Sequence, residues 1–544
     1  MREYRLLGPP GTGKTSWVVK QLERASQKYA PEEIYLSSFT RAAAVEIASR
    51  VQASGVPVAR ENIGTVHALC YRALGGPIIA ETMMGEWSAK YPQWALSKDR
   101  NQERMLDEAA MDEDSSQDLL QEYNLARGKF PSTARAEPSE ISARVYRELP
   151  PATQRFAQAW EEFKADMGLL DFTDMLLQAP ESLPRCKVLI IDEAQDLNPL
   201  QWQIVRRWGE QAEIFCVAGD EDQTLYRFMG ATPASLMTPI APENVMHLHQ
   251  SYRVPRRVHE VAQRWILRLG PRRNEKPYHP TDQEGEVVCS PLGLADPEAL
   301  AQALLDEAAA GRTVMCLASC SYMLRQVTQA LREIGAPFHN PYRRRRGDWN
   351  PLGHKETLRK VASFGLALRA LQDDDRATLR QGATWSWVQL IRAKDNLSHG
   401  LKKALQELGE EVSDPAVFIE PLVSGLSAPA MDAWRAGDWN WLVANLTEES
   451  RRQGEYAARI LQRGGDVTRL DPKIIVGTIH SVKGGEADAV YLIPELSRAS
   501  VQDVQDNGQE AEDAIVRMAY VGMTRARQKL VLCEPSTKLY FEVA

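Results

Sequence analysis

A phosphate-binding pattern lies near the start of the chain, at Gly8-Pro9-Pro10-Gly11-Thr12-Gly13-Lys14-Thr15. Glycines at this spacing let backbone N–H groups close on phosphate oxygens, and a helix N-terminus favours the anion. We expect Lys14 to reach the β- and γ-phosphates, the Thr15 hydroxyl to ligate Mg²⁺, and Ser16 to complete the loop. An ordinary Gly/Pro turn is the alternative, but the length, the lysine and the threonine together favour a site for ATP and Mg²⁺.

Two adjacent carboxylates supply the second half of such a site. The apolar run Leu189-Ile190-Ile191 ends at Asp192 and Glu193, and open α/β sheets bind ligands at the carboxyl ends of their strands. We expect Asp192 to hold the Mg²⁺ that bridges the phosphates. Glu193 is predicted to polarise the attacking water as general base. An exposed acidic pair at a strand end is the alternative.

Short apolar runs separated by helical patterns must position these residues. Strands are expected at 4–7, 34–36, 187–191, 213–218, 286–289, 313–317, 473–476, 489–492 and 529–532. Strands that alternate with helices indicate parallel sheets. The fold class is therefore predicted to be α/β, with two lobes that each carry a mainly helical insertion.

The domain boundaries follow from changes in composition. Strand-like runs vanish where Trp, Met, Glu and Gln dominate, and again in a later stretch rich in Leu, Ala and Trp. We predict a first lobe at 1–75 and 176–243, its helical insertion at 76–175, a second lobe at 244–345 and 469–544, and its insertion at 346–468.

Composition narrows the class of protein. The 544 residues are 44% hydrophobic and 25% charged, as in soluble globular proteins. The net charge of -8 gives no global nucleic-acid signal, so any such site must be a local groove. The seven cysteines form no C-x-x-C pair, which favours reduced thiols in a cytoplasmic protein. No apolar run is long enough to span a bilayer, and because a phosphate loop lies so near the start we expect no signal peptide.

The acidic segment Asp192-Glu193-Ala194-Gln195-Asp196 resembles motif II of superfamily 1 helicases of the UvrD/Rep/PcrA type. Other segments resemble the family's remaining motifs in the right order: Ia at 38–44, Ib at 64–70, III at 219–228, IV at 248–253, V at 477–486 and VI at 520–527. The resemblance spans nearly the whole chain. It implies two RecA-like lobes with ATP held in the cleft between them.

The resemblance also implies roles for residues around the nucleotide. Arg253 and Arg525 match arginines that stabilise charge developing on the γ-phosphate. Gln223 matches the residue that senses the γ-phosphate and reports it to the DNA groove. Tyr252 matches the aromatic residue that stacks on adenine, and Glu486 matches the carboxylate that bonds the ribose.

Single-stranded DNA requires aromatic faces for its bases and donors for its phosphates. By resemblance, the DNA-binding residues are Phe39, Thr40, His67, Tyr226, Phe228 and His480. Phe39 and Phe228 match positions that stack bases, whereas the two histidines match positions near the backbone. Satisfied interior histidines are the alternative for these two. The four arginines at 343–346 either contact DNA or lie in a solvated loop.

Several positions depart from the family pattern. Only seven residues precede Gly8, so we expect the adenine-reading Gln found upstream in the family to be absent. Met229 stands where Arg is common, and Gly485 stands where Leu is common. The second insertion is shorter than usual, and no nuclease domain is expected after Arg527. Nucleotide selectivity and the coupling of ATP to DNA are therefore expected to differ.

The resemblance implies an ATP- and Mg²⁺-dependent helicase or translocase on single-stranded and tailed duplex DNA, moving 3′-to-5′. Such a DNA-dependent ATPase is expected to act in DNA repair or replication. We expect it to be a monomer or weak oligomer that does not bind a membrane, and the sequence does not identify a protein that loads it on DNA. Three alternatives remain open. They are a translocase that strips proteins without unwinding, an ATP-gated DNA-binding recruitment protein with little turnover, and a ring ATPase inferred from the phosphate loop alone.

Overall fold

Two compact units make up the protein. The computed structural model describes residues 3–96, 116–129, 145–342, 349–353, 355–372, 386–409, 416–465, 467 and 471–543. The first unit comprises Met1–Ser290, Leu317–Ser321 and Thr478–Ala544, and the second comprises Pro291–Cys316 and Tyr322–Gly477. The four arginines at 343–346 lie outside the described residues.

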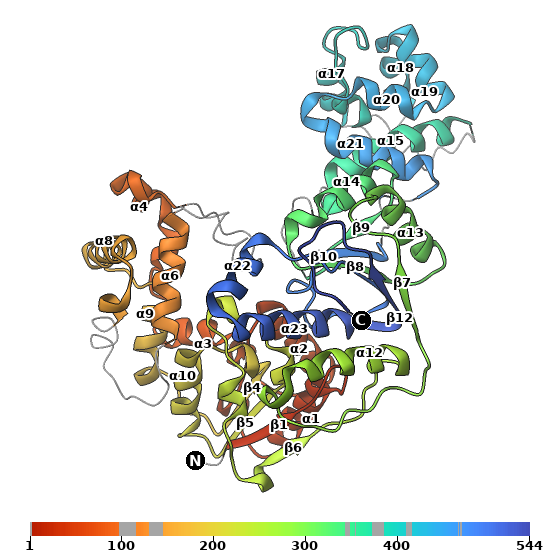
Figure 1. Ribbon diagram of the computed structural model, residues 1–544. Helices are drawn as coiled ribbons and strands as arrows, with labels where there is room; N and C mark the ends of the chain where they lie inside the picture. Colours follow the sequence, from red (N-terminus) through yellow and green to blue (C-terminus); the bar gives the residue numbers. More distant parts are fainter. Residues whose placement is uncertain are drawn as a thin grey trace. The chain divides into compact units, whose positions relative to one another are not determined.

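A parallel sheet forms the centre of the first unit (Figure 1). Its strand order is β3-β2-β4-β5-β1-β6. The strands are β1 (Glu3–Leu7), β2 (Ile34–Ser38), β3 (Ile63–Gly64), β4 (Val188–Asp192), β5 (Ile214–Gly219) and β6 (Val245–His247). Because the paired strands run parallel, the carboxyl ends of the neighbours β4, β5 and β1 meet at one edge of the sheet.

Helices cover both faces of this sheet because its strand residues alternate between two cores. In β4, Val188 and Ile190 pack into one core, and Leu189 and Ile191 pack into the other. The covering helices are α1 (Lys14–Ser26), α2 (Arg41–Ala53), α3 (Val66–Ala73), α9 (Phe172–Gln178) and α10 (Pro199–Gly209). Burial on both faces explains why β4 is apolar at every position before Asp192.

A helical insertion with its own aromatic core lies between α3 and α9. Its helices are α4 (Met84–Lys90), α6 (Ser116–Gly128) and α8 (Pro151–Met167). The ring of Trp87 is fully buried, with centroid distances of 5.0 Å to Trp160 and 5.5 Å to Phe163. These edge-to-face contacts hold α4 against α8.

A buried charge cluster ties α6 and α8 to the start of α9. The fully buried Arg127 pairs with Asp171 and, at 2.9 Å, with Asp174. Lys164 Nζ lies 2.8 Å from Asp171, and Trp160 Nε1 donates to the same carboxylate at 3.1 Å. Asp171 also caps α9 by accepting from the Asp174 backbone N–H at 2.7 Å. Arg127, Lys164, Asp171 and Asp174 are named the insertion cluster below.

A second six-stranded sheet has the order β7-β12-β11-β8-β10-β9. Its strands are β7 (Glu286–Ser290), β8 (Val314–Ala318), β9 (Phe338–His339), β10 (Ile474–Thr478), β11 (Ala487–Leu492) and β12 (Ala526–Cys533). Four further helices of the first unit are α11 (Ala234–Met237), α12 (Arg256–Ile266), α22 (Arg498–Asn507) and α23 (Gln509–Met523). The pairs β7–β12, β12–β11 and β10–β9 are parallel, as in the first sheet.

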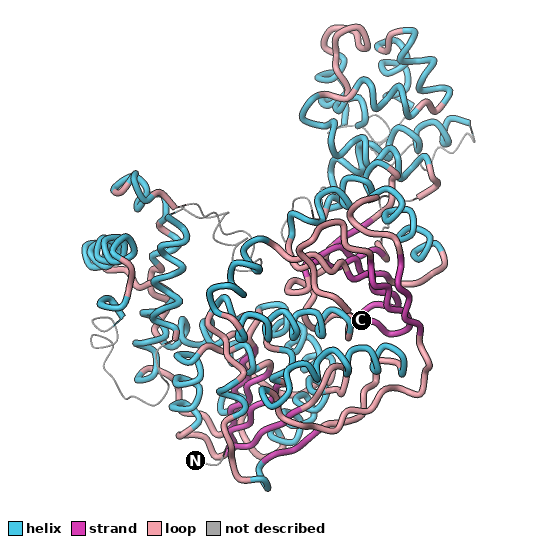
Figure 2. The backbone as a smooth tube through the Cα atoms, viewed as in Figure 1, coloured by secondary structure: helices cyan, strands magenta, loops and turns pink. Residues whose placement is uncertain are grey.

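The second unit is mainly helical (Figure 2). Its described helices are α13 (Pro297–Ala309), α14 (Arg325–Glu333), α15 (Lys355–Gln372), α17 (Leu401–Gly409), α18 (Ala416–Gly425), α19 (Ala428–Ala436), α20 (Trp439–Asn445) and α21 (Glu448–Gln462). An aromatic core holds part of it together, because the buried Trp387 ring lies 5.0 Å from Phe364 and 6.1 Å from Trp434.

The predicted α/β class is confirmed, and each expected strand is present with boundaries shifted by a few residues. The expectations missed β3, β6 and β9, which are strands of two or three residues at the edges of the sheets. So short a strand carries too little alternation to be visible in sequence. None of the helices in the described ranges has both the length and the apolar character needed to cross a bilayer.

Candidate active site

The phosphate loop joins β1 to α1 and is tied to the neighbouring strand. The Gly8 backbone N–H donates to the Gly219 carbonyl at the end of β5 at 3.2 Å. Gly11 and Gly13 have φ angles of 73° and 82°, a left-handed conformation that glycine adopts without strain. Lys14 opens α1 and donates from Nζ to the Gly8 carbonyl at 2.6 Å. The loop thus ends at a helix N-terminus, where N–H groups and the helix dipole favour a phosphate.

The remaining loop side chains take different positions. Thr12 Oγ1 donates to the Pro9 carbonyl at 2.8 Å and fixes the turn. Thr15 and Ser16 lie in the first turn of α1, with Thr15 half-buried and Ser16 exposed. Burial lowers the pKa of Lys14, although the charges of nearby carboxylates oppose that shift.

Asp192 ends β4 as a buried carboxylate. It is 1% exposed, and its Oδ1 has no hydrogen-bond partner among the described residues. Burial, and then repulsion from Glu193, raises the pKa of Asp192 to about 7. An orphaned carboxylate oxygen and the Thr15 hydroxyl are hard oxygen donors of the kind Mg²⁺ takes. The residues present therefore fit the predicted metal.

Glu193 follows in a strained conformation and is held by two partners. Its φ of 54° is left-handed, which is rare for a residue other than glycine. Gln195 Nε2 donates to Glu193 Oε2 at 2.6 Å, and Lys483 Nζ lies 3.2 Å from the same oxygen. Burial would raise the pKa of Glu193, but Lys483 and Lys14 hold it below its usual range. Glu193 is therefore ionised at neutral pH, as a general base must be.

Gln223 connects the end of β5 to Arg525. Its Nε2 donates to Asp220 Oδ2 at 2.7 Å, and its Oε1 accepts from Arg525 Nη2 at 3.0 Å. Arg525 is 1% exposed and also donates to the carbonyls of Val521 and Gly485. The structure thus brings together two of the residues predicted to act on the γ-phosphate.

Residues 251–253 lie against the phosphate loop. The Tyr252 backbone N–H donates to the Gly11 carbonyl at 2.8 Å. A Cβ on Gly11 would come within 2.6 Å of Arg253 Cβ, so only glycine allows this approach. The Tyr252 side chain is 77% exposed, and its ring lies 3.9 Å from the place of a Cβ on Gly13. An aromatic face is therefore open beside the loop.

Arg253 and Glu486 form an ion pair. Arg253 Nε donates to Glu486 Oε2 at 2.7 Å, and Arg527 Nη1 donates to Oε1 at 3.2 Å. Burial would raise the pKa of Glu486, but the arginines hold it below its usual range. Two residues predicted to bind different parts of the nucleotide thus bind each other.

Four of the predicted DNA-binding side chains, Phe39, Tyr226, Phe228 and His480, form one aromatic group. Ring centroids lie 4.7 Å apart for Phe39 and Tyr226, 5.9 Å for Tyr226 and Phe228, and 5.5 Å for Phe228 and His480. Tyr226 and His480 are each 3% exposed, whereas Phe39 and Phe228 are partly exposed. The faces available for stacking therefore belong to the two phenylalanines.

The other two predicted DNA contacts have local structural partners. Thr40 caps α2, since its Oγ1 accepts from the Ala43 backbone N–H at 3.1 Å. The His67 ring packs edge-on against Phe172 of α9 at 5.9 Å. Burial, with repulsion from Arg41, lowers the pKa of His67 to about 4. His67 is thus neutral at physiological pH and offers no charge to a phosphate.

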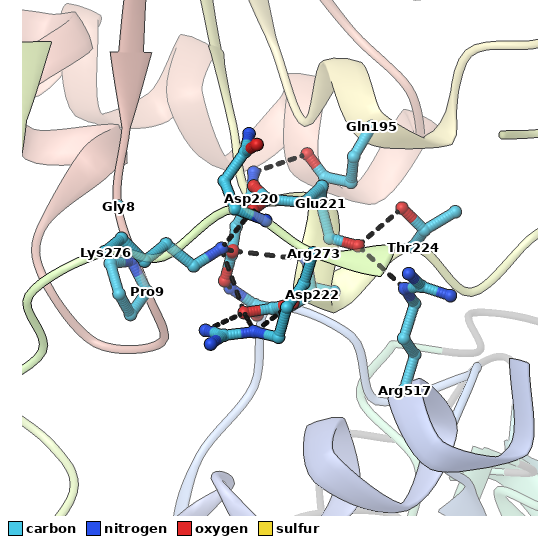
Figure 3. Close-up of polar contacts among 12 residues, drawn as sticks. Gly8, Pro9, Gln195, Asp220, Glu221, Asp222, Thr224, Arg273, Lys276 and Arg517 are labelled. Carbon is cyan, nitrogen blue, oxygen red and sulfur yellow. Dashed lines mark hydrogen bonds and ion pairs between the residues drawn. The ribbon is translucent and has the colours of Figure 1, made fainter. Parts of the chain in front are cut away.

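Three cations close to these residues have no role that the sequence predicts. Lys483 pairs with Asp196 as well as Glu193, and its Nζ donates to the Gln223 carbonyl at 3.1 Å. Its place in motif V was the available signal. Arg273 and Lys276 lie between α12 and β7, outside every motif, yet they contact the residues after β5 (Figure 3).

A parallel sheet with a glycine-rich loop after β1 and an acidic end on β4 defines a phosphate-loop nucleotide-binding protein. Residues 2–240 match the model of the UvrD/REP helicase N-terminal domain, and residues 458–536 match that of the UvrD-like helicase C-terminal domain. The chain therefore belongs to the UvrD/Rep family of superfamily 1 helicases, and the resemblance noted in its motifs is confirmed.

Curated relatives are similar over nearly the whole chain. ATP-dependent DNA helicase UvrD2 of Mycobacterium tuberculosis is 25% identical over 97% of this chain and 76% of its own length. ATP-dependent DNA helicase PcrA of Bacillus subtilis is 24% identical over 98% of this chain and 81% of its own. DNA helicase II of Escherichia coli is 23% identical, covering 98% and 82%.

Proposed function

We propose that the protein is an ATP-dependent DNA helicase that moves 3′-to-5′ along single-stranded DNA. The main supporting observation is the Gln223 amide, which bonds both Asp220 at the end of β5 and Arg525 of the last motif. This arrangement links the phosphate-binding sheet to a cation from the C-terminal part of the chain. Family membership and the names of the relatives support DNA as the substrate.

The described side chains divide the work of hydrolysis. Amides of the phosphate loop and Lys14 bind the triphosphate. Asp192 and Thr15 would hold Mg²⁺, which when bound neutralises charge on the β- and γ-phosphate oxygens. Glu193 takes a proton from the attacking water. Arg253 and Arg525 stabilise the charge that develops on the transferred group.

Short stretches of chain join the nucleotide residues to the aromatic group. Gln223 and Tyr226 belong to one segment, and Lys483 and His480 belong to another. His480 Nε2 donates to the Leu225 carbonyl at 3.3 Å, which fastens the two segments together. A shift of Gln223 toward a γ-phosphate therefore moves the rings on which DNA bases stack.

ATP hydrolysis with and without single-stranded oligonucleotides, followed by unwinding of 3′- and 5′-tailed duplexes, tests this proposal. We expect DNA to stimulate hydrolysis, unwinding to need a 3′ tail, and Lys14→Ala to abolish both. DNA binding should weaken with added salt. Unwinding from 5′ tails alone would show that the protein moves 5′-to-3′ instead. Stimulated hydrolysis without strand separation would indicate a translocase, and the absence of stimulation would indicate a recruitment protein.

A further inference from the structure

Three successive carboxylates after β5 share one lysine (Figure 3). Asp220, Glu221 and Asp222 are all 0% exposed. Lys276 Nζ pairs with Asp220 and lies 2.9 Å from Glu221 and 3.0 Å from Asp222, and its side chain is 2% exposed. Three buried negative charges so close together require countercharge, because desolvation and mutual repulsion both disfavour ionisation. Asp220, Glu221, Asp222, Arg273 and Lys276 are named the strand-end cluster.

The two cations of this cluster share Asp222 but differ in their other partners. Arg273 binds Asp222 through two guanidinium nitrogens: Nη2 donates to one carboxylate oxygen at 2.7 Å, and Nε donates to the other at 3.1 Å. Lys276 is the cation that also reaches Asp220. Burial would raise the pKa of Asp220, but Lys276 and Lys14 hold it below its usual range. Asp220 is therefore an ionised acceptor.

Asp220 in turn fixes the orientation of Gln223. Its Oδ1 accepts from Lys276 and its Oδ2 accepts from Gln223 Nε2 at 2.7 Å. With Nε2 held on Asp220, the amide presents its Oε1 to Arg525, which donates to it from Nη2 at 3.0 Å. A continuous chain of bonds thus runs from Lys276 through Asp220 and Gln223 to Arg525.

We propose that Lys276 is a positioning residue for ATP hydrolysis: it holds Asp220, and Asp220 orients the Gln223 amide toward Arg525 and the γ-phosphate. The inference rests on the proposed function, because Gln223 has a role only if ATP is hydrolysed. Lys276 lies 56 residues beyond Asp220 in sequence, on the segment that leads into β7.

Lys276→Met tests the inference, and Arg273→Met is its matched control. Both substitutions remove one buried cation from the same cluster, but only Lys276 contacts Asp220. We expect Lys276→Met to lower DNA-stimulated kcat roughly tenfold while KM for ATP changes less than about twofold. Arg273→Met should lower the Tm without lowering the kcat of the folded protein. An equal fall in kcat for both variants would overturn the proposal.

Two further variants separate positioning from stability. Lys276→Met with Glu221→Gln restores the charge balance but leaves Asp220 unheld, so the Tm should recover while kcat stays low. Recovery of both would overturn the proposal. Should Lys276→Met not fold, Asp220→Asn carries the test, since it removes a buried negative charge and one of the two acceptors. It should fold with reduced kcat, and wild-type kcat would overturn the proposal.

Assays of the wild-type protein distinguish a failure of the proposed function from a failure of the role proposed for Lys276. Hydrolysis of ATP that single-stranded oligonucleotides do not stimulate would remove the proposed function and this inference with it. Stimulated hydrolysis in the wild type, together with wild-type kcat in Lys276→Met, would remove only the role of Lys276.

Discussion

The insertion cluster and the strand-end cluster are both built from buried ion pairs, but the two clusters serve different purposes. In both, carboxylates that are 0% exposed pair with buried lysine and arginine. The bonds of Asp171 lead to Arg127, Lys164 and Trp160, which all belong to the insertion. The bonds of Asp220 continue through Gln223 to Arg525. Burial and ion pairing therefore do not mark a functional residue, whereas the onward bond to the nucleotide site does.

The largest contrast should come from Glu193→Gln. Loss of the general base should lower turnover by roughly 10²–10⁴-fold, while nucleotide binding and the Tm stay near wild type. Glu161→Gln, at the partly exposed margin of the insertion cluster, is the control and should keep full turnover. ATPase rates and titration with a fluorescent ATP analogue measure both. Normal turnover in Glu193→Gln would refute the assigned base.

Arg127→Met should produce the opposite pattern. It leaves the fully buried Asp171 with fewer partners, so the free energy of unfolding should fall by about 3–5 kcal/mol. The kcat of the folded protein should not change, because no bond leads from Arg127 to the nucleotide residues among the described contacts. Denaturant unfolding and ATPase assays test this. A fall in kcat at unchanged stability would erase the distinction between the clusters.

Phe228→Ala tests a region that acts without charge. Removing one partly exposed ring should weaken single-stranded DNA binding by roughly 1–3 kcal/mol and leave basal hydrolysis intact. Tyr226→Phe is the matched control, since it keeps the buried ring and loses only a 3.4 Å hydroxyl contact to the His480 carbonyl. Fluorescence anisotropy with a labelled oligonucleotide measures both. Equal losses in the two variants would contradict the assignment of stacking to Phe228.

The last prediction concerns pH and the carboxyl group of Glu81 in the insertion. Burial, followed by repulsion from Asp171, raises the pKa of Glu81 to about 8. Between the unfolded pKa of about 4.3 and that value, the unfolded chain releases the proton and the folded protein keeps it, so stability falls as pH rises. Glu81→Gln keeps the acceptor for the Phe172 N–H and removes this slope. Thermal unfolding at pH 5 and pH 8 should show stabilisation mainly at pH 8, and an equal shift at both values would exclude a titrating Glu81.

Local spacing explains what the sequence could predict. The phosphate loop and the Asp192–Glu193 pair are contiguous patterns whose geometry follows from a strand, a turn and a helix. The α/β class followed from the alternation of apolar runs with helical patterns. The edge strands β3, β6 and β9 are too short for such a signal.

Contacts between distant segments explain what the sequence could not predict. Lys276 meets Asp220 across fifty-six residues, and no local pattern marks either as a partner. The neutral state of His67 follows from burial and from Arg41, neither of which is visible in motif Ib alone. The roles of Arg253, Arg525 and Gln223 stay proposals that the variants above address.

The ion pair between Arg253 and Glu486 bears on how tightly a nucleotide is held. Under the proposed roles, an arriving ATP replaces a carboxylate by a phosphate at Arg253 and a guanidinium by a ribose hydroxyl at Glu486. The net gain in binding free energy is therefore the difference between the contacts with the nucleotide and the ion pair that they replace, rather than the full strength of either. Release of the product nucleotide is correspondingly easier, because Arg253 and Glu486 can pair with each other again. A helicase that must release a nucleotide in every cycle benefits from such reversibility.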